Sequence, residues 1–137
     1  MSLARCVASL AALLTSTVGA GCGTGDDERR VRSVTDQFYA ALWAHTGERA
    51  CAHLAENTVN ALESASGRSC AQAITALQLP GRRAAGSTVY LDSARADVVG
   101  AAPGEAAFLD RTARGWRISA VGCRPNGDGP YDCRLNG

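Results

Sequence analysis

The spacing of apolar residues predicts a helix early in the chain. From Val31 onwards apolar side chains recur at intervals of three and four residues, which places them on one stripe of a helix. We expect this helix to pack its stripe against a core and to end before His45-Thr46-Gly47, where the pattern breaks. The stripe consists of Val31, Val34, Phe38, Ala41 and Leu42.

Shorter helices are predicted between residues 46 and 79. Thr46 is expected to cap one helix, and another turn or two begins at Asn57 and ends near residue 67. The spacing of Ser69 to Gln72 fits a capping box for a further helix. Pro80 and the glycine after it end that helix, because proline cannot continue it. The residues expected to face inward are Ala50, Cys51, Leu54, Cys70, Ile74 and Leu77, and the turn from Asn57 passes through Val59 and Leu62.

The second half of the chain consists of short segments typical of β-strands. Turn formers such as Pro103-Gly104 separate these segments, at spacings that suit hairpins. In the last segment Trp116 and Ile118 alternate with more polar positions, so one face suits a core. Helices followed by an antiparallel meander predict an α+β fold, with the helices on one face of a curved sheet of about four strands. The predicted strands span 87–91, 94–100, 105–111 and 115–122.

Composition restricts the number of domains and the class of partner. A chain of 137 residues with 46% apolar content has room for one compact domain. The formal net charge is +1 and the basic residues are scattered, so there is no electrostatic argument for a nucleic-acid partner. We therefore expect one α+β domain over residues 29–137, with no cofactor and no nucleic-acid binding.

The first residues are typical of an export signal. Arg5 supplies a positive charge, and an uncharged, mostly apolar run extends from Cys6 to Val18. This run is too short to cross a hydrocarbon core of ~30 Å, which takes roughly 20 apolar residues in a helix. We therefore interpret residues 1–21 as a signal peptide that is removed.

The small residues before Cys22 resemble a bacterial lipobox. Ala20 and Gly21 match its two small positions, whereas Gly19 stands where an aliphatic residue is usual. Cys22 is the thiol that would carry diacylglycerol, and each buried acyl methylene contributes ~0.8 kcal/mol, so two or three chains hold firmly. We expect a lipidated tether over residues 22–28, at the outer face of the bacterial cytoplasmic membrane. The alternative is an ordinary signal peptide and a secreted protein without lipid.

Four cysteines remain when the signal cysteine and the acyl acceptor are set aside. Thiols outside the cytosol tend to be oxidised, so two disulfides are expected. Of the three pairings, we predict Cys51 with Cys70 and Cys123 with Cys133. The turn formers between Cys123 and Cys133 would bring these ends together as a stapled loop. No metal site is expected, because zinc-binding cysteines lie in pairs two to four residues apart.

The end of the chain carries a more specific pattern. Residues 115–125 read Gly-Trp-Arg-Ile-Ser-Ala-Val-Gly-Cys-Arg-Pro, and Tyr131-Asp132-Cys133 follows. Together with Ala50-Cys51 and Cys70, this pattern resembles a group of uncharacterised actinobacterial lipoproteins with the nuclear transport factor 2-like fold. The resemblance covers most of residues 29–137 and implies a cone in which a bent sheet wraps a long helix. It assigns no activity to particular residues, because this fold hosts enzymes and binding proteins alike.

Enzymes on this fold include isomerases, dehydratases and cyclases, and their acids, histidines or tyrosines face the interior of the cone. The corresponding residue types here are Asp36, Tyr39, His45 and His53, which form no recognisable catalytic pattern. Asp36 and Tyr39 are three apart and would share a helix face. We expect Asp36 to be solvated and Tyr39 to lie at the edge of the core with its hydroxyl in water. We assign no catalytic residue and favour a function other than catalysis.

A pocket at the mouth of the cone is a further candidate site. Tyr39, Trp43 and Trp116 are its candidate walls, because ligand pockets combine aromatic surfaces with a few polar groups. The alternative is that both tryptophans are anchors of the core. Three functions stay open, in this order: a module that binds a small ligand or an envelope protein, a cryptic small-molecule enzyme, and a purely structural envelope domain. A homodimer also stays open, because many cone folds pair through the open face of the sheet.

Overall fold

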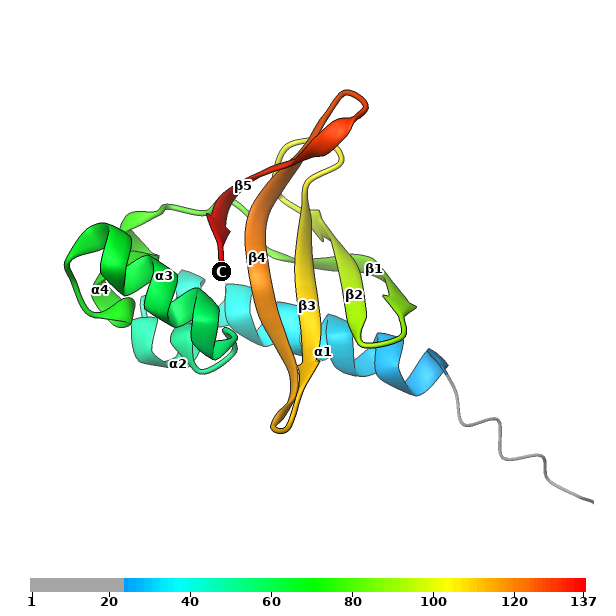
Figure 1. The fold of residues 1–137 in the computed structure, drawn as a ribbon, viewed down its shortest axis with the longest axis horizontal. Coiled ribbons are helices and arrows are strands. Elements are labelled where there is room, and N and C mark those ends of the chain that lie inside the picture. Colours follow the sequence, from blue (N-terminus) through cyan, green and yellow to red (C-terminus); the bar gives the residue numbers. More distant parts are fainter. Residues whose placement is uncertain (1–23) are drawn as a thin grey trace, which may run out of the picture.

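In the computed structural model, which describes residues 24–137, one long helix lies across a face of an antiparallel sheet (Figure 1). The helix, α1, spans Thr24–Trp43, and the five strands follow one another in the sheet in the order of the chain. The predicted α+β class is therefore confirmed, with five strands in place of about four. The strands span Arg83–Tyr90 (β1), Ser93–Val99 (β2), Ala106–Thr112 (β3), Gly115–Asn126 (β4) and Gly129–Asn136 (β5).

Helix α1 begins seven residues before the start of the predicted apolar stripe. Its buried side chains include Val31, Phe38 and Ala41, as the spacing predicted. Residues 24–28, which were expected as a tether, form its first turns. Asp26 and Asp27 lie there, where carboxylates interact favourably with the positive end of the helix dipole. The predicted signal peptide and the acceptor Cys22 lie outside the described residues.

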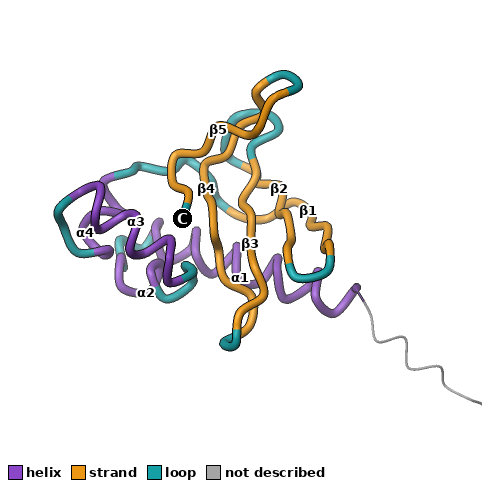
Figure 2. The backbone as a smooth tube through the Cα atoms, in the orientation of Figure 1, coloured by secondary structure: helices purple, strands orange, loops and turns teal. Residues whose placement is uncertain are grey.

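Three short helices gather at the C-terminal end of α1 (Figure 2). They are α2 (Gly47–Cys51), α3 (Glu56–Ser66) and α4 (Cys70–Ala76). Close packing joins α2 to α4, because a Cβ on Gly47 would lie 2.3 Å from the carbonyl oxygen of Ala71. None of the helices in residues 24–137 is both long and apolar enough to cross a bilayer.

The predicted side-chain caps of α2 and α4 are wrong, because neither Thr46 nor Ser69 makes a cap hydrogen bond. Thr46 precedes α2, but its hydroxyl donates back to the carbonyl of Ala41, at 3.0 Å, and makes no cap bond. Ser69 precedes α4 without a side-chain cap bond, and the first amide of that helix, on Cys70, donates instead to Glu63 Oε1 at 2.8 Å. A carboxylate from α3 therefore caps α4, which a search for local capping patterns does not detect.

The segment predicted as a stapled loop near the C-terminus is a β-hairpin. Strand β4 continues to Asn126, and β5 returns after a two-residue turn in which Gly127 has φ 53°. Cys123 lies directly opposite Cys133 in the strand register, and the two form a disulfide. The prediction of a loop is wrong because only Gly127 and Asp128 form the turn, whereas the other turn formers between Pro125 and Pro130 lie in the paired strands.

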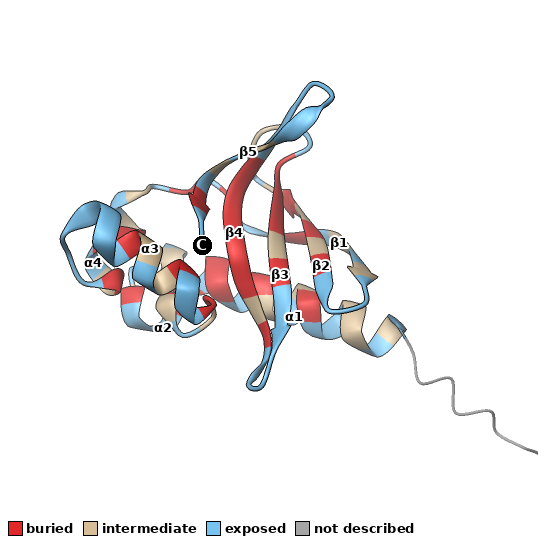
Figure 3. Cartoon of the chain, in the orientation of Figure 1, coloured by how far each residue is buried: buried red, intermediate tan, exposed pale blue. Residues whose placement is uncertain are grey.

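The core fills the space between α1, the sheet and the short helices. Phe38, Leu109 and Ile118 have no exposed surface, and burial concentrates in the middle of β4 and on the sheet-facing side of α1 (Figure 3). Gly81 closes over Tyr39 so tightly that a Cβ there would lie 2.4 Å from the Tyr39 ring. The interior of the fold is therefore packed with side chains around Tyr39.

Loss of the Cys51–Cys70 disulfide is predicted to destabilise the helical end. This disulfide joins α2 to α4 across a separation of 19 residues. Replacing both cysteines by alanine should lower the free energy of unfolding by about 3 kcal/mol, because the unfolded chain gains conformational entropy. Denaturant unfolding measures the change. Cys123→Ala with Cys133→Ala is the matched control and should cost slightly less, because its loop is shorter. An unchanged midpoint for the first pair contradicts this account.

Candidate functional site

The structure does not gather the three predicted pocket residues at one site. Trp116 is 3% exposed, and its indole N–H donates to Asp27 Oδ1 near the start of α1. Tyr39 is fully buried one turn before the end of α1, and Trp43 is 52% exposed at the end of that helix. A helix of 20 residues is about 30 Å long, so the two tryptophans mark opposite ends of the fold. The three side chains therefore do not form one pocket.

Trp43 borders a groove of about 420 Å³ between the end of α1 and the end of α4. This volume lies within the range of small-molecule sites. The floor is apolar and the rim carries hydroxyl, amide and imidazole groups, which is the composition that such sites share. We call it the Trp43 groove, and its lining residues are Leu42, Trp43, His45, Ile74, Thr75, Gln78, Leu79 and Pro80.

The indole of Trp43 is held in place despite its exposure. Its N–H donates to the carbonyl of Gly81 at 3.0 Å, and the guanidinium of Arg82 lies 4.2 Å from the ring centre. A cation over an indole is attracted by the negative face of the ring. An exposed aromatic ring with two such constraints offers a rigid surface, so a ligand would order few additional side-chain torsions.

Two residues on the rim hold a backbone conformation that favours glycine. His45 has φ 55° and Gln78 has φ 49°, and each follows the last turn of a helix. The amide of His45 donates to Leu42, and the next amide donates to Ala41, which is the Schellman pattern that usually ends on glycine. A side chain in this conformation costs about 1–2 kcal/mol. Glycine at both positions would therefore make the fold more stable.

A second groove, of about 590 Å³, lies between α3, α4 and β5. It is larger than the Trp43 groove, but no aromatic ring lines it, and its apolar walls come from alanine and leucine side chains. Its two cations, Arg68 and Arg134, are its main polar groups. Of these two grooves, the Trp43 groove is the one that has both an aromatic wall and strained residues on its rim. We therefore take the Trp43 groove as the candidate site.

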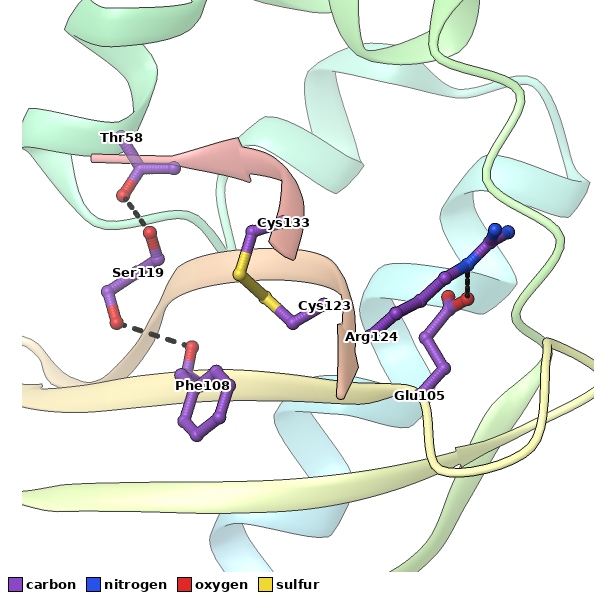
Figure 4. Close-up of a disulfide and its surroundings, with 7 residues drawn as sticks. All are labelled: Thr58, Glu105, Phe108, Ser119, Cys123, Arg124 and Cys133. Atoms are coloured by element: carbon purple, nitrogen blue, oxygen red, sulfur yellow. Dashed lines mark hydrogen bonds and ion pairs between the residues drawn. A yellow bond between two sulfur atoms is a disulfide. The ribbon is translucent and has the colours of Figure 1, made fainter. Parts of the chain in front are cut away.

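The interior holds a carboxyl group that sequence reasoning missed. Glu105 is 2% exposed, and its Oε1 has no hydrogen-bond partner within residues 24–137. Its Oε2 lies 3.5 Å from the Arg124 guanidinium, which reaches across beside the Cys123–Cys133 disulfide (Figure 4). A buried carboxylate that keeps a single cation as partner is costly to the fold.

Tyr39 differs from its expected setting at the edge of the core. Its hydroxyl is buried and has no partner in the described part of the chain. Burial, and secondly the negative charge of Glu105, raise the pKa of Tyr39 well above its ordinary value. The phenol therefore stays protonated at neutral pH and cannot act as a base.

The other candidate catalytic residues lie apart from one another. Asp36 is exposed as expected, but Oδ1 accepts a hydrogen bond of 2.7 Å from the amide of Ala84, which ties α1 to β1. His45 lines the Trp43 groove. His53 follows α2, where burial, and secondly the charge of Arg117, lower its pKa. No proton-transfer pair forms among them.

Residues 24–137 hold no group of three or more histidine, cysteine or acidic side chains placed to bind a metal ion. Comparison with protein-family models, with curated proteins and with solved structures finds no match for this chain. The functional argument therefore depends on the geometry of the site alone.

Removing the Tyr39 hydroxyl is predicted to stabilise the fold. Tyr39→Phe keeps the ring and deletes a buried polar group without a partner, so the free energy of unfolding should rise by about 1 kcal/mol. The wild type should also lose stability as the pH rises above about 10, because its folded state binds the phenolic proton more tightly than the unfolded state does. The Tyr39→Phe variant should lose less stability over the same rise in pH.

Denaturant unfolding at neutral and alkaline pH measures both effects. Tyr90→Phe is the matched control, because this ring is 59% exposed and its loss should change neither result. A destabilised Tyr39→Phe would show that the hydroxyl has a partner, such as an ordered water.

Proposed function

We propose that the chain is a lipid-anchored, extracytoplasmic binding module that takes a small ligand in the Trp43 groove. The observation that carries this proposal is the combination of a fixed indole wall with two strained rim residues, His45 and Gln78. Non-glycine residues in this backbone conformation concentrate at ligand clamps and other functional sites, where their side chains have a use that offsets the cost.

The lining residues define the chemistry of the ligand. Leu42, Ile74 and Leu79 provide apolar contact, so the ligand has an apolar body that packs on the Trp43 ring. No acidic residue lines the groove, and the Gln78 amide supplies hydrogen-bond donors at its rim, whereas the Thr75 hydroxyl donates to the carbonyls of Ala71 and Gln72 in its own helix. Arg82 lies next to it, over the indole. A planar apolar molecule with a hydrogen-bond acceptor or a negative group fits this arrangement.

The anchor and the compartment support each other in this proposal. A diacylated Cys22 would place the domain at the outer face of the cytoplasmic membrane, where cysteines oxidise. The two disulfides agree with export. A secreted form without lipid is the alternative. We also propose a nuclear transport factor 2-like fold, and a long helix crossed by a curved meander supports it.

An enzyme is the second candidate function, because Glu105 and Tyr39 are an inward-facing acid and phenol. Their packing argues against it. Gly81 closes directly over the Tyr39 ring with Val98 beside it, so a substrate would have to displace core residues to reach the hydroxyl. A surface groove needs no such rearrangement, and binding is therefore the function that the geometry supports better.

Variants of the groove are predicted to separate binding from folding. The probe is anilinonaphthalene sulfonate, which has a planar apolar body and a negative group. Trp43→Ala should weaken its binding about tenfold, which corresponds to 1.4 kcal/mol. His45→Gly with Gln78→Gly should raise the free energy of unfolding by about 1 kcal/mol for each residue, yet weaken binding as well. Fluorescence titration and denaturant unfolding measure the two effects.

Arg68→Ala is the matched control for these variants, because Arg68 lines the larger groove and not the Trp43 groove. It should leave binding of the probe unchanged. If Arg68→Ala weakens binding and Trp43→Ala does not, the probe occupies the larger groove and our assignment of the site is wrong.

The anchor is predicted to be visible in the intact mass of protein extracted from native membranes. The mass should fit residues 22–137 with acyl chains, and reduction should add four hydrogens, two for each disulfide. A mass without lipid would show the secreted alternative. A mass that does not change on reduction would contradict the oxidised state.

A further inference from the structure

The turn between β1 and β2 carries an apolar side chain that projects into solvent. Leu91 is 91% exposed, and its neighbour Tyr90 is 59% exposed. Tyr90 pairs with Ser93, so the loop between the strands has only two residues. We call Tyr90 and Leu91 the hairpin tip.

The backbone at this tip does not favour leucine. Leu91 has φ 53°, a conformation in which tight hairpin turns normally carry asparagine, aspartate or glycine. Its side chain therefore strains the backbone and exposes apolar surface at once. Asparagine would remove both the backbone strain and the exposed apolar surface. Leucine at this position therefore does not stabilise the isolated fold.

The hairpin tip and the start of α1 occupy the same end of the molecule (Figure 1). The Arg111 guanidinium lies 2.7 Å from Asp27 in the first turns of α1 and 3.4 Å from Asp92 in the turn. The Arg111 amide also donates to the carbonyl of Asp92, at 2.7 Å. The turn therefore has a fixed position beside the first residues of the helix.

The chain leaves little room between this end and the acceptor cysteine. Cys22 precedes Thr24 by two residues, and two fully extended residues span about 7 Å. A lipid on Cys22 would therefore hold the bilayer surface next to the start of α1. The hairpin tip would face the same surface, since Arg111 ties the two together.

We propose that the hairpin tip inserts into the bilayer that holds the lipid on Cys22 and so fixes the orientation of the domain. This inference rests on the proposed anchor. Leu91 enters the acyl boundary and the Tyr90 ring lies at the headgroups, where amphipathic aromatic side chains are enriched in membrane proteins. The Trp43 groove, at the other end of α1, then lies about 30 Å from the membrane and opens to the envelope space.

Depth-dependent fluorescence quenching tests the insertion. Leu91→Trp in the full, lipidated chain is reconstituted into phosphatidylglycerol and phosphatidylethanolamine vesicles that contain brominated phosphatidylcholine, which quenches indoles within the bilayer. Asp128→Trp is the matched control, on the exposed turn between β4 and β5, which projects away from the start of α1 (Figure 1). Trp43 and Trp116 give the same background in both proteins.

We expect the added emission of Leu91→Trp to shift to the blue and to be quenched, and that of Asp128→Trp to be unaffected. Vesicle flotation on the same samples separates the two proposals. Protein that floats without quenching of Leu91→Trp overturns the insertion and leaves the anchor standing. Protein that does not float overturns the anchor, and the insertion with it. Equal quenching of both variants indicates adsorption without a preferred orientation and overturns the proposal. A blue shift of the Leu91→Trp emission without vesicles indicates that a second copy of the chain covers the tip, and it also overturns the proposal.

A second variant tests orientation without a new tryptophan at the tip. Leu91→Asn suits the turn, so the fold should be retained, which thermal unfolding checks. In an Asp128→Trp background, energy transfer to dansyl-labelled lipid should increase when Leu91→Asn is added, because a domain that tumbles on its anchor brings the far turn nearer the bilayer. Unchanged energy transfer contradicts a fixed orientation.

Discussion

The guanidinium of Arg111 joins the start of α1 to two strands of the sheet. It binds Asp27 of α1 through two nitrogens, at 2.7 and 3.3 Å, and lies 4.5 Å from the centre of the Trp116 ring. The same Asp27 accepts the indole N–H of Trp116, so helix, β3 and β4 meet at one carboxylate. These hydrogen bonds, first from Arg111 and then from Trp116, lower the pKa of Asp27. A bidentate pair also specifies geometry, and this one aligns α1 with the sheet that its apolar stripe packs against.

The fold could be predicted where local chemistry decides it. The apolar stripe from Val31 and the β-type segments after residue 86 lie on α1 and the sheet as expected, and the two disulfides join the nearest neighbours. Prediction failed where a distant partner decides the structure. The acidic residues before Arg29 resemble a tether until Asp27 is seen to bind Arg111, 84 residues away. The turn formers near residue 127 hid a strand whose pairing depends on β4.

The candidate site could likewise be predicted only in part, because tertiary contacts decide most of it. Their aromatic rings made Trp43 and Trp116 candidate pocket walls, but only tertiary packing separates an exposed wall from an indole buried on Arg111. Glu105 has no local signal, since a single acid at the start of a strand is usually solvated. The strained rim is also invisible in the sequence, because His45 and Gln78 fill positions that are recognised as helix ends when they carry glycine.

The spacing of the disulfides has a consequence for how the chain matures. Each bond joins cysteines that are consecutive in the order Cys51, Cys70, Cys123 and Cys133, at separations of 19 and 10 residues. A chain exported as we propose emerges from its translocation channel in that order, so each cysteine meets its correct partner before the next pair arrives. A simple thiol oxidase, which joins cysteines as they appear, would then produce the native pairing without an isomerase to correct it.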